Sequence, residues 1–228
     1  LEMLGARRDI LDQPAFFNVV VNARAVYRNK KGHWEAVFSA GAGGSKKNGS
    51  RMTMIYIPPG EFAMGLKWET GGAEDESPQH RVNLNGYWIG KFEITFDQYD
   101  FFCIETNKKQ LLSDRGRGRG SRPVFGVTWS MSQEYCQWLS RSSGLVFRLP
   151  TEAEWEKAAR GTDARRYPWG EALPDCEKAN FDRCVGDTDA VDMNPAGASP
   201  YGVMGMSGNV WEWTSDWYAS DTYQSHTA

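Results

Sequence analysis

Histidine and paired cysteines, the usual ligands of zinc and iron, are scarce in this sequence. The 228 residues include three His and four Cys, and no two Cys form a Cys-x-x-Cys pair or stand at the spacing of a zinc site. These absences argue against a zinc centre and against a histidine-rich iron centre. No apolar run approaches the roughly 20 residues that a membrane-spanning helix requires, so we expect no membrane span.

A strong net charge is also missing. The formal net charge of -3 and the isoelectric point near 5.7 provide no general attraction to nucleic acid, so we expect no nucleic-acid partner. The "RGRGRG" tract at 115–120 is short and lacks interleaved aromatic residues, so we interpret it as a loop. The first residues, "LEMLGARRDILDQP", lack the apolar core of a secretory signal, which favours the cytoplasm. Because the chain begins at Leu1, we expect a trimmed fragment.

The four cysteines fall into two pairs with different surroundings. Cys103 and Cys136 lie in aromatic helical patterns and are expected to be buried apolar groups. Cys176 and Cys184 flank a loop. For them we expect two free thiols, with a disulfide as the alternative in an oxidising environment.

The composition points to a fold with many loops. Ten Trp, nine Tyr and eleven Phe accompany 24 Gly and ten Pro, which indicates irregular segments anchored by large aromatic side chains. At the N-terminus, two β-rich runs around "NKKG" predict a β-hairpin within residues 17–38. The glycine-rich residues 39–50 then predict a flexible linker. We therefore expect a hairpin appendage at 1–38, a linker at 39–50 and one main domain at 51–228.

The middle of the chain combines strands with capped helices. Residues 52–64 predict a second hairpin around "PPG", and "VNLNGYWIGKFEIT" alternates as a strand does. Thr95 is expected to cap one helix, and Ser130 with Gln133 forms a capping box for another that stops at Gly144. In "RLPTEAEWEKAARG", Thr151 and Glu154 form a further capping box, so the carboxylates there favour the helix start without a catalytic role.

Beyond residue 161 the chain is expected to be mostly irregular and rich in Asp, Asn and Gly. Long ordered loops need something to hold them, and their carboxylates and carbonyls offer the oxygen ligands that Ca²⁺ prefers. The last recognisable element, "GNVWEWTSDWY", alternates as a strand does.

Seven segments in one order resemble the formylglycine-generating enzyme family, also called the sulfatase-modifying-factor family. They are "IPPGEFAMG", "ESPQHRV", "YWIGKFEIT", "RPVFGVTWSMSQEYCQWL", "RLPTEAEWEKAARG", "YPWG" and "SPYGVMGMSGNVWEWTSDWY", and they extend from residue 57 to 218. The resemblance implies an α+β, C-type-lectin-like fold with little regular structure and, in many members, structural calcium.

The resemblance also implies where calcium would bind. The carbonyls of Gly208 and Val210 and the carboxylate of Glu212 match one family calcium site, but Gly205 replaces the usual Asp or Asn. That site is therefore either weakened or empty, and Glu212 alternatively pairs with a nearby Arg. A second family site begins at Asn180 and Phe181, with Asp187 or Asp189 supplying the acid, and its role would be structural.

Two functions stay open on this resemblance. Catalytic members oxidise a cysteine of a client sulfatase to formylglycine with copper held by two cysteines near the C-terminus, downstream of "GNVWEW". The chain stops at Ala228, before that segment, and only residues 108–122 fill an interval where catalytic members carry a long insertion. We therefore expect a non-catalytic module that binds or displays a protein or small ligand, similar to the variable proteins of diversity-generating retroelements. The alternative is a copper-dependent oxidase with its cysteine pair beyond residue 228.

Overall fold

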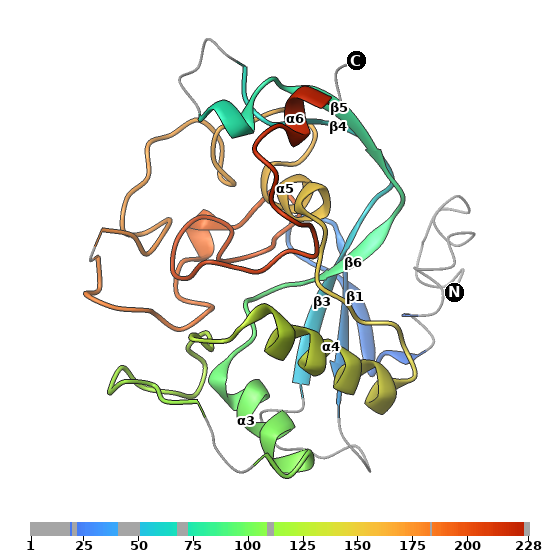
Figure 1. Ribbon diagram of the computed structural model, residues 1–228, viewed down its shortest axis with the longest axis vertical. Helices are drawn as coiled ribbons and strands as arrows, with labels where there is room; N and C mark the ends of the chain where they lie inside the picture. The colour runs from blue at the N-terminus through green and yellow to red at the C-terminus, as the bar shows by residue number, and fades with distance from the viewer. Residues whose placement is uncertain are drawn as a thin grey trace.

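A computed structural model describes residues 19, 22–40, 51–67, 73–108, 112–182 and 184–225. In Figure 1, strands and three α-helices make up the middle of the chain, whereas the orange and red C-terminal part consists mainly of loops. This combination is the α+β class that the sequence predicts. The linker predicted at 39–50 lies outside the described residues, apart from residues 39 and 40.

The main sheet has four antiparallel strands in the order β1-β2-β3-β6. They are β1 (Ala25–Arg28), β2 (Trp34–Ser39), β3 (Arg51–Ile57) and β6 (Tyr87–Gly90). The β1-β2 pair confirms the predicted N-terminal hairpin, and Gly32 at its turn has a φ of 82°. Since β2 also pairs with β3, the hairpin packs on the rest of the sheet, while the domain boundaries themselves stay a prediction.

The second hairpin predicted at residues 52–64 is wrong. β4 (Gly60–Met64) does form, but it pairs with β5 (His80–Leu84) in a separate two-stranded sheet. β3 is a central strand with β2 and β6 as its two neighbours, so no edge of it is left for β4. The chain between β3 and β4 therefore changes sheets instead of forming a tight hairpin.

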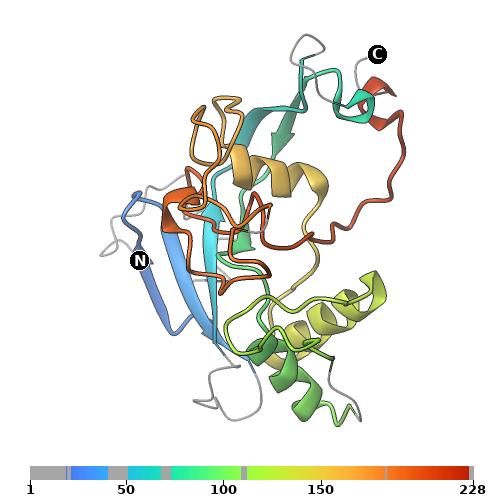
Figure 2. The same ribbon diagram turned by 90° about the vertical axis from the view of Figure 1, so that its left-hand side faces the viewer.

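Alternate residues of β3 enter two different apolar clusters, because consecutive side chains of a strand point to opposite faces. Met52 and Met54 pack with aromatic residues of α3 (Phe96–Glu105) and α4 (Trp129–Ser143). Ile55 and Ile57 pack with Ala158 and Ala159 of α5 (Glu152–Arg160) and with Tyr201, Val203 and Met206. Figure 2 shows α3 and α4 near one end of the molecule and α5 nearer the other.

Two of the three predicted helix starts are confirmed. The Thr95 side chain accepts a hydrogen bond from the Gln98 N–H at the start of α3. At the start of α5, Thr151 and Glu154 form the predicted capping box, and Gly161 follows the last helical residue. The local capping signals therefore predicted correctly where these two helices begin.

The third predicted start, at Ser130, is wrong by two residues. Thr128 is the N-cap of α4, because its hydroxyl accepts the Met131 N–H and leaves Ser130 inside the first turn. The predicted end is confirmed, since Gly144 adopts the left-handed conformation with a φ of 72°.

In the second half of the chain, the described residues 161–225 form only the 3-10 helix η6 (Pro195–Gly197) and the short α6 (Thr222–Ser225). The strand predicted at "GNVWEWTSDWY" does not form. Its backbone bonds elsewhere: the Trp129 indole donates to the Thr214 carbonyl at 2.9 Å, and the Ser215 N–H donates to the Pro150 carbonyl at 2.8 Å. An alternating pattern does not form a strand unless a neighbouring strand is available for pairing.

Candidate functional site

Asn209 connects the loops at Asn180 and Asp189 in the irregular half to Glu93, which follows β6. Its amide nitrogen donates to Glu93 Oε1 at 3.0 Å and to the Asp189 carbonyl at 3.3 Å. Its amide oxygen accepts the Asp189 N–H at 2.8 Å, and its backbone N–H donates to the Asn180 carbonyl at 2.8 Å. Asn209 has a φ of 66°, a conformation that Asn tolerates better than most residues.

This network brings together two of the acidic residues expected near calcium. Asn180 donates from Nδ2 to the Asp187 carbonyl at 2.7 Å. The Asp187 carboxylate, however, forms an ion pair with Arg117 at 3.1 Å, and Asp189 Oδ1 accepts the Ala190 N–H at 2.8 Å. Phe181 is 39% exposed beside them. The family-like site at Asn180, Phe181, Asp187 and Asp189 stays a prediction, with the acids now engaged by protein groups.

Glu93 occupies the place that a side chain at position 205 would take. An ideal Cβ built on Gly205 would lie under 3.0 Å from the carboxyl carbon and both oxygens of Glu93. The two segments run side by side, because the Met204 N–H donates to the Lys91 carbonyl at 2.8 Å. The residue that the family usually has at 205 is therefore absent, and a carboxylate from another segment fills its space.

The Glu93 carboxylate is buried and only partly hydrogen-bonded. The residue is 7% exposed, and among the described residues its Oε2 has no hydrogen-bond partner. Burial raises the pKa of Glu93, while hydrogen bonds from its own backbone and from Asn209 oppose the rise. A buried, half-satisfied carboxylate is costly unless a positive group completes its surroundings.

Glu212 places a second carboxylate beside the first. Glu212 is an exposed residue that lines the same large cavity as Glu93. Desolvation of its carboxyl group, together with the Glu93 charge, raises the pKa of Glu212 to about 8. The predicted pairing of Glu212 with an Arg does not occur among the residues that the structure describes.

The donors around these two carboxylates fit a hard cation better than a soft one. Within the described part of the chain, no group of three or more His, Cys, Asp or Glu is arranged to hold a metal ion. A cavity of about 20 Å³, room for one water-sized occupant, is lined by Glu93, Gly205 and Gly208. Lys178 also lines it, and Glu212 does not. Carboxylate oxygens and backbone carbonyls are the ligands that Ca²⁺ prefers. The predicted roles of Gly208, Val210 and Glu212 as calcium ligands stay a prediction.

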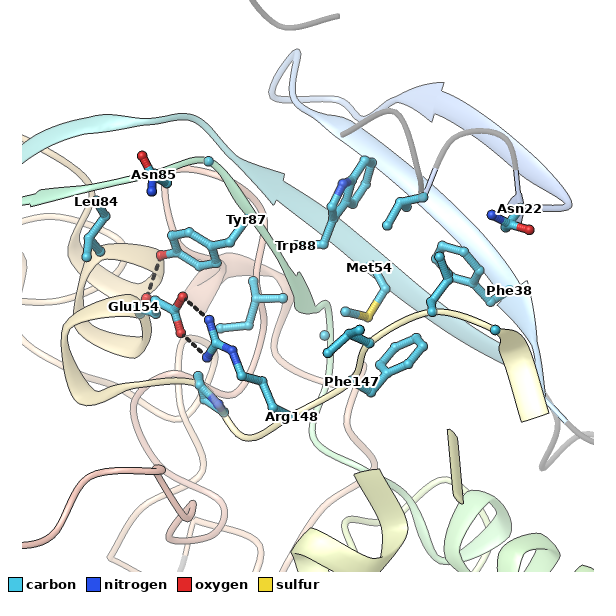
Figure 3. A pocket seen from close by; sticks show the side chains of 18 of the residues that line it. Asn22, Phe38, Met54, Leu84, Asn85, Tyr87, Trp88, Phe147, Arg148 and Glu154 are labelled. Carbon is cyan, nitrogen blue, oxygen red and sulfur yellow. Dashed lines mark hydrogen bonds and ion pairs between the residues drawn. The ribbon is translucent and has the colours of Figure 1, made fainter. Parts of the chain in front are cut away.

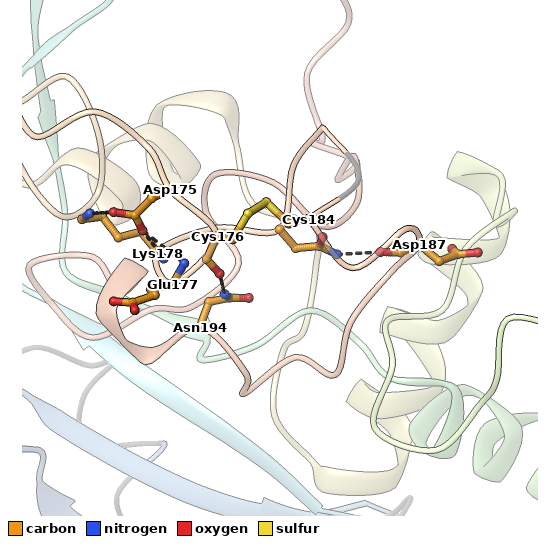
Figure 4. The surroundings of a disulfide bond; sticks show 8 residues. Asp175, Cys176, Glu177, Lys178, Cys184, Asp187 and Asn194 are labelled. Carbon is orange, nitrogen blue, oxygen red and sulfur yellow. Dashed lines mark hydrogen bonds and ion pairs between the residues drawn. A yellow bond between two sulfur atoms is a disulfide. The ribbon is translucent and has the colours of Figure 1, made fainter.

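The prediction of two free thiols at Cys176 and Cys184 is wrong. The two sulfur atoms form a disulfide across a loop with a sequence separation of eight, drawn in Figure 4. The loop is tied down further, because Asn194 donates to the Cys176 carbonyl at 2.9 Å and Asp175 accepts from the Lys178 side chain. The Cα atoms of Cys176 and Cys184 lie 5.5 Å apart, within the range that a disulfide needs. The sequence alone does not reveal that distance.

The other two cysteines are free and poorly suited to act as thiolates. Cys103 is 1% exposed in α3, and Cys136 is half-buried in α4. Burial raises the pKa of both thiols, that of Cys136 to about 11. The expectation that both are packing residues agrees with these positions.

A groove of about 770 Å³ lies along β6, next to the segment that joins α4 to α5. Figure 3 shows Phe38, Met54, Trp88 and Phe147 around its apolar part. At the other end, the Tyr87 hydroxyl donates to the Glu154 carbonyl at 2.6 Å. A groove with mostly apolar walls and a few fixed polar groups is typical of ligand sites.

An ion pair fixes the polar end of the groove. Both terminal nitrogens of Arg148 donate to the Glu154 carboxylate, each at 2.6 Å, as Figure 3 shows. Glu154 also accepts the Thr151 N–H at 2.8 Å, so one carboxylate caps α5 and orients Arg148. Burial alone would raise the pKa of Glu154, but the bonds from Arg148 and Thr151 outweigh it and lower that pKa.

Two arginines of the "RGRGRG" loop bind other parts of the chain. Arg119 donates to the Asp100 carboxylate and to the Leu112 carbonyl, and its guanidinium lies over the Phe96 ring. Arg117 pairs with Asp187. These contacts agree with the interpretation of the tract as a loop.

Sequence reasoning missed Glu93 and Asn209. The strand prediction for "VNLNGYWIGKFEIT" gives Glu93 no role, although Glu93 is a single acid between Phe92 and Ile94. Asn209 follows Gly208 in "GNVWEW", and a Gly-Asn pair is a signal for left-handed backbone.

Within the residues that the structure describes, no helix is long and apolar enough to cross a membrane.

Comparison with known proteins agrees with this geometry. Residues 40–228 match the family model described as the sulfatase-modifying factor enzyme 1-like domain. The chain is 35% identical over 237 residues to the formylglycine-generating enzyme of Thermomonospora curvata, which covers 76% of this chain and 74% of that protein. It is also 35% identical over 191 residues to the serine/threonine-protein kinase pkn1 of Chlamydia pneumoniae, covering 75% of this chain. The matched region is 29% of the length of that kinase.

Solved structures show the same fold. PvdO from Pseudomonas aeruginosa superposes with a TM-score of 0.68 at 24% identity, covering 87% of this chain and 76% of PvdO. The Treponema denticola variable protein 1 superposes with a TM-score of 0.60 at 23% identity, covering 80% of this chain and 77% of that one. The segments that first suggested a resemblance thus lie within a matching fold, and the chain belongs to the sulfatase-modifying factor enzyme 1-like family.

Proposed function

We propose that this domain is a non-catalytic binding module of its family, which holds a protein or small ligand in the groove along β6. The observation that carries the proposal is the groove itself, about 770 Å³ in volume, with aromatic walls and a rigid Arg148–Glu154 pair at one end. Such a groove buries apolar ligand surface and orients a polar ligand group at one point.

The positions of the cysteines support binding over oxidation. A copper oxidase of this family would need two thiolates near each other, and Cu⁺ favours soft sulfur ligands. Two of the four cysteines are joined in a disulfide, and burial raises the pKa of the other two, on α3 and α4. The oxidase therefore stays the second candidate, and it would depend on a cysteine pair outside these 228 residues.

Exposed aromatic residues add a second surface suited to contacts. Trp211 and Trp217 are 102% and 91% exposed, and Tyr218 is 78% exposed. Tyr and Trp are enriched at protein interfaces relative to the rest of the surface. The similarity to the Treponema denticola variable protein 1 is compatible with a display role for this part of the fold.

A peptide-display selection on the immobilised protein tests the groove. Selected peptides are expected to bind the wild type and to lose at least about tenfold in affinity with Val146→Arg, measured by fluorescence anisotropy, because a long charged side chain then replaces an apolar contact at the groove. Val146 is 92% exposed on the groove, so its replacement should leave the fold intact. Leu173→Arg is the matched control, an equally simple change at a 75% exposed residue that does not line the groove.

Two results would overturn the proposal. One is a selection that yields no binder. The other is binding that Val146→Arg and Leu173→Arg weaken equally. The oxidase is tested separately, by incubating the protein with Cu⁺, oxygen and a synthetic cysteine-containing sulfatase peptide, and we expect mass spectrometry to find the cysteine unchanged.

A further inference from the structure

A second cavity, of about 200 Å³, adjoins the groove and has two acids in its lining. The groove and this cavity have six lining residues in common, which are Met54, Ile89, Gly90, Phe147, Arg148 and Pro150. Glu93 and Glu212 line the cavity, and neither lines the groove. We call this cavity the acidic pocket. One extended ligand can therefore lie in the groove and place a side chain in the acidic pocket.

The two acids of the pocket lack a counter-charge. Glu93 is 7% exposed, its Oε1 accepts from Asn209 at 3.0 Å, and its Oε2 has no partner among the described residues. The carboxyl group of Glu212 lies close enough to Glu93 for the two charges to interact. Because each carboxylate loses water and repels the other, a positive group between them is favourable.

Basic residues near the pocket are paired with other acids. Arg148 lines the pocket, but both of its terminal nitrogens donate to Glu154 at 2.6 Å. Lys178 lines the small cavity at Glu93, but its ammonium pairs with Asp175. In the described part of the chain, no Lys or Arg forms an ion pair with either acid of the pocket. A ligand can supply the positive charge that these residues do not.

The rest of the pocket selects a ligand group with an apolar stem. Apolar side chains make up much of the lining, among them Met52, Val124, Leu139, Val203, Trp211 and Trp213. A single ion or water molecule would leave most of the 200 Å³ empty. A lysine side chain fits both features, because its four-carbon stem packs on apolar surface while its ammonium stays with polar groups.

The geometry of Glu93 favours an ammonium over a guanidinium. Asn209 occupies Oε1, so one oxygen of this carboxylate is left for a ligand. A guanidinium binds best to both oxygens of one carboxylate, whereas an ammonium is a point charge with three donors that reach separate acceptors. One ammonium can therefore bind Glu93 Oε2 and the Glu212 carboxylate together.

We propose that the acidic pocket receives a lysine side chain of a polypeptide that lies in the groove, with the ammonium held by Glu93 and Glu212. This inference rests on the proposed binding function, because the groove brings the polypeptide to the pocket. It adds the chemical identity of the anchoring side chain, which the groove alone does not specify.

NMR titration of the ¹⁵N-labelled protein with Nα-acetyl-L-lysine-N-methylamide tests the pocket without a peptide in the groove. EDTA is present throughout, so that no metal ion occupies the carboxylates. We expect the indole signals of Trp211 and Trp213 to shift. The norleucine derivative, which has the same stem without the charge, should bind at least about tenfold more weakly, since it lacks the charged hydrogen bonds.

Variants show which acid produces the preference for lysine. Glu93→Gln should bind the two derivatives equally, whereas Glu134→Gln should keep the preference, because Glu134 pairs with Lys108 and is 55% exposed. Circular dichroism shows whether each variant is folded. No binding of the lysine derivative, equal binding of both derivatives by the wild type, or an unchanged preference in Glu93→Gln would each refute the lysine pocket.

The peptides selected on the groove separate this inference from the proposed function. Each peptide should contain a Lys whose replacement by norleucine costs at least about tenfold in affinity, and replacement by Arg should also weaken binding. Peptides that bind the groove equally well without Lys would refute the lysine pocket and leave the proposed function intact. Val146→Arg should leave binding of the lysine derivative unchanged, since Val146 lines the groove and not the pocket.

Discussion

The two halves of this molecule differ in how much of their structure depends on apolar packing and how much on polar contacts. Residues 25–160 contain the four-stranded sheet and the helices α3, α4 and α5, and apolar clusters fill the space between them. Residues 161–225 contain almost no regular structure among the described positions. Tyr201, Val203 and Met206 anchor them in the apolar cluster of the first half, and a disulfide and the Asn209 network hold the loops. Apolar burial tolerates many substitutions of similar volume, whereas a polar network depends on each partner. The second half should therefore respond most to changes in single polar groups and to ions.

The largest expected effect comes from the core of the first half. Phe102→Ala removes a side chain that is 2% exposed between α3 and α4, and it should lower the free energy of unfolding by about 3 to 5 kcal/mol. Ile104→Ala, on the same helix but 60% exposed, should change it by less than about 0.5 kcal/mol. Urea denaturation followed by circular dichroism measures both. Equal effects of the two variants would mean that the apolar cluster does not carry this half.

Removal of the disulfide should have the next largest effect, confined to the second half. Cys176→Ser with Cys184→Ser should cost about 2 to 3 kcal/mol, because the loop regains its freedom in the unfolded chain. Limited proteolysis should cut the 176–184 loop faster, and the sheet should stay protected. In denaturant without reductant, we expect two of the four cysteines to react with a thiol reagent. Reaction of all four would contradict the bond.

Glu154 offers a test that depends on pH. Its pKa in the folded protein is lowered, so its stabilising contribution is present above the ordinary glutamate pKa and is lost as the pH falls through the lowered value. Glu154→Gln should therefore cost about 1 to 2 kcal/mol near neutral pH, since the half-exposed Arg148 weakens the pair through solvent screening. The difference from the wild type should vanish in acid. A difference that persists at low pH would point to packing instead of charge.

The smallest expected effect concerns the start of α4. Thr128→Ala should cost about 1 kcal/mol, because it removes the hydroxyl that accepts the Met131 N–H. Ser130→Ala should change stability by a few tenths of a kcal/mol, since Ser130 lies inside the first turn. Thermal denaturation compares the two. The opposite ranking would restore the sequence-based cap at Ser130.

Local signals in the sequence predicted local structure well. Thr95, Thr151 and Gly144 mark helix ends because caps act within one turn of the chain. Local signals did not predict that β4 pairs with β5, because strand pairing depends on which strands the fold brings side by side.

The candidate site was only half predictable for the same reason. Glu212 and the carbonyls of Gly208 and Val210 follow from one short segment. Glu93 lies more than a hundred residues away in sequence, and only the fold reveals that its carboxylate fills the space at Gly205. The Cys176–Cys184 bond likewise depends on a distance that composition does not contain.

Hydrogen exchange of the wild type and of Asn209→Ala tests the contrast between the halves most directly. In the variant, amides of residues 180–212 should exchange several-fold faster, because the side chain of Asn209 joins Glu93 to the loop at Asp189. The amides of β3 and α3 should keep their rates. Equal acceleration in both halves, or no change in residues 180–212, would contradict the account that a polar network orders the second half.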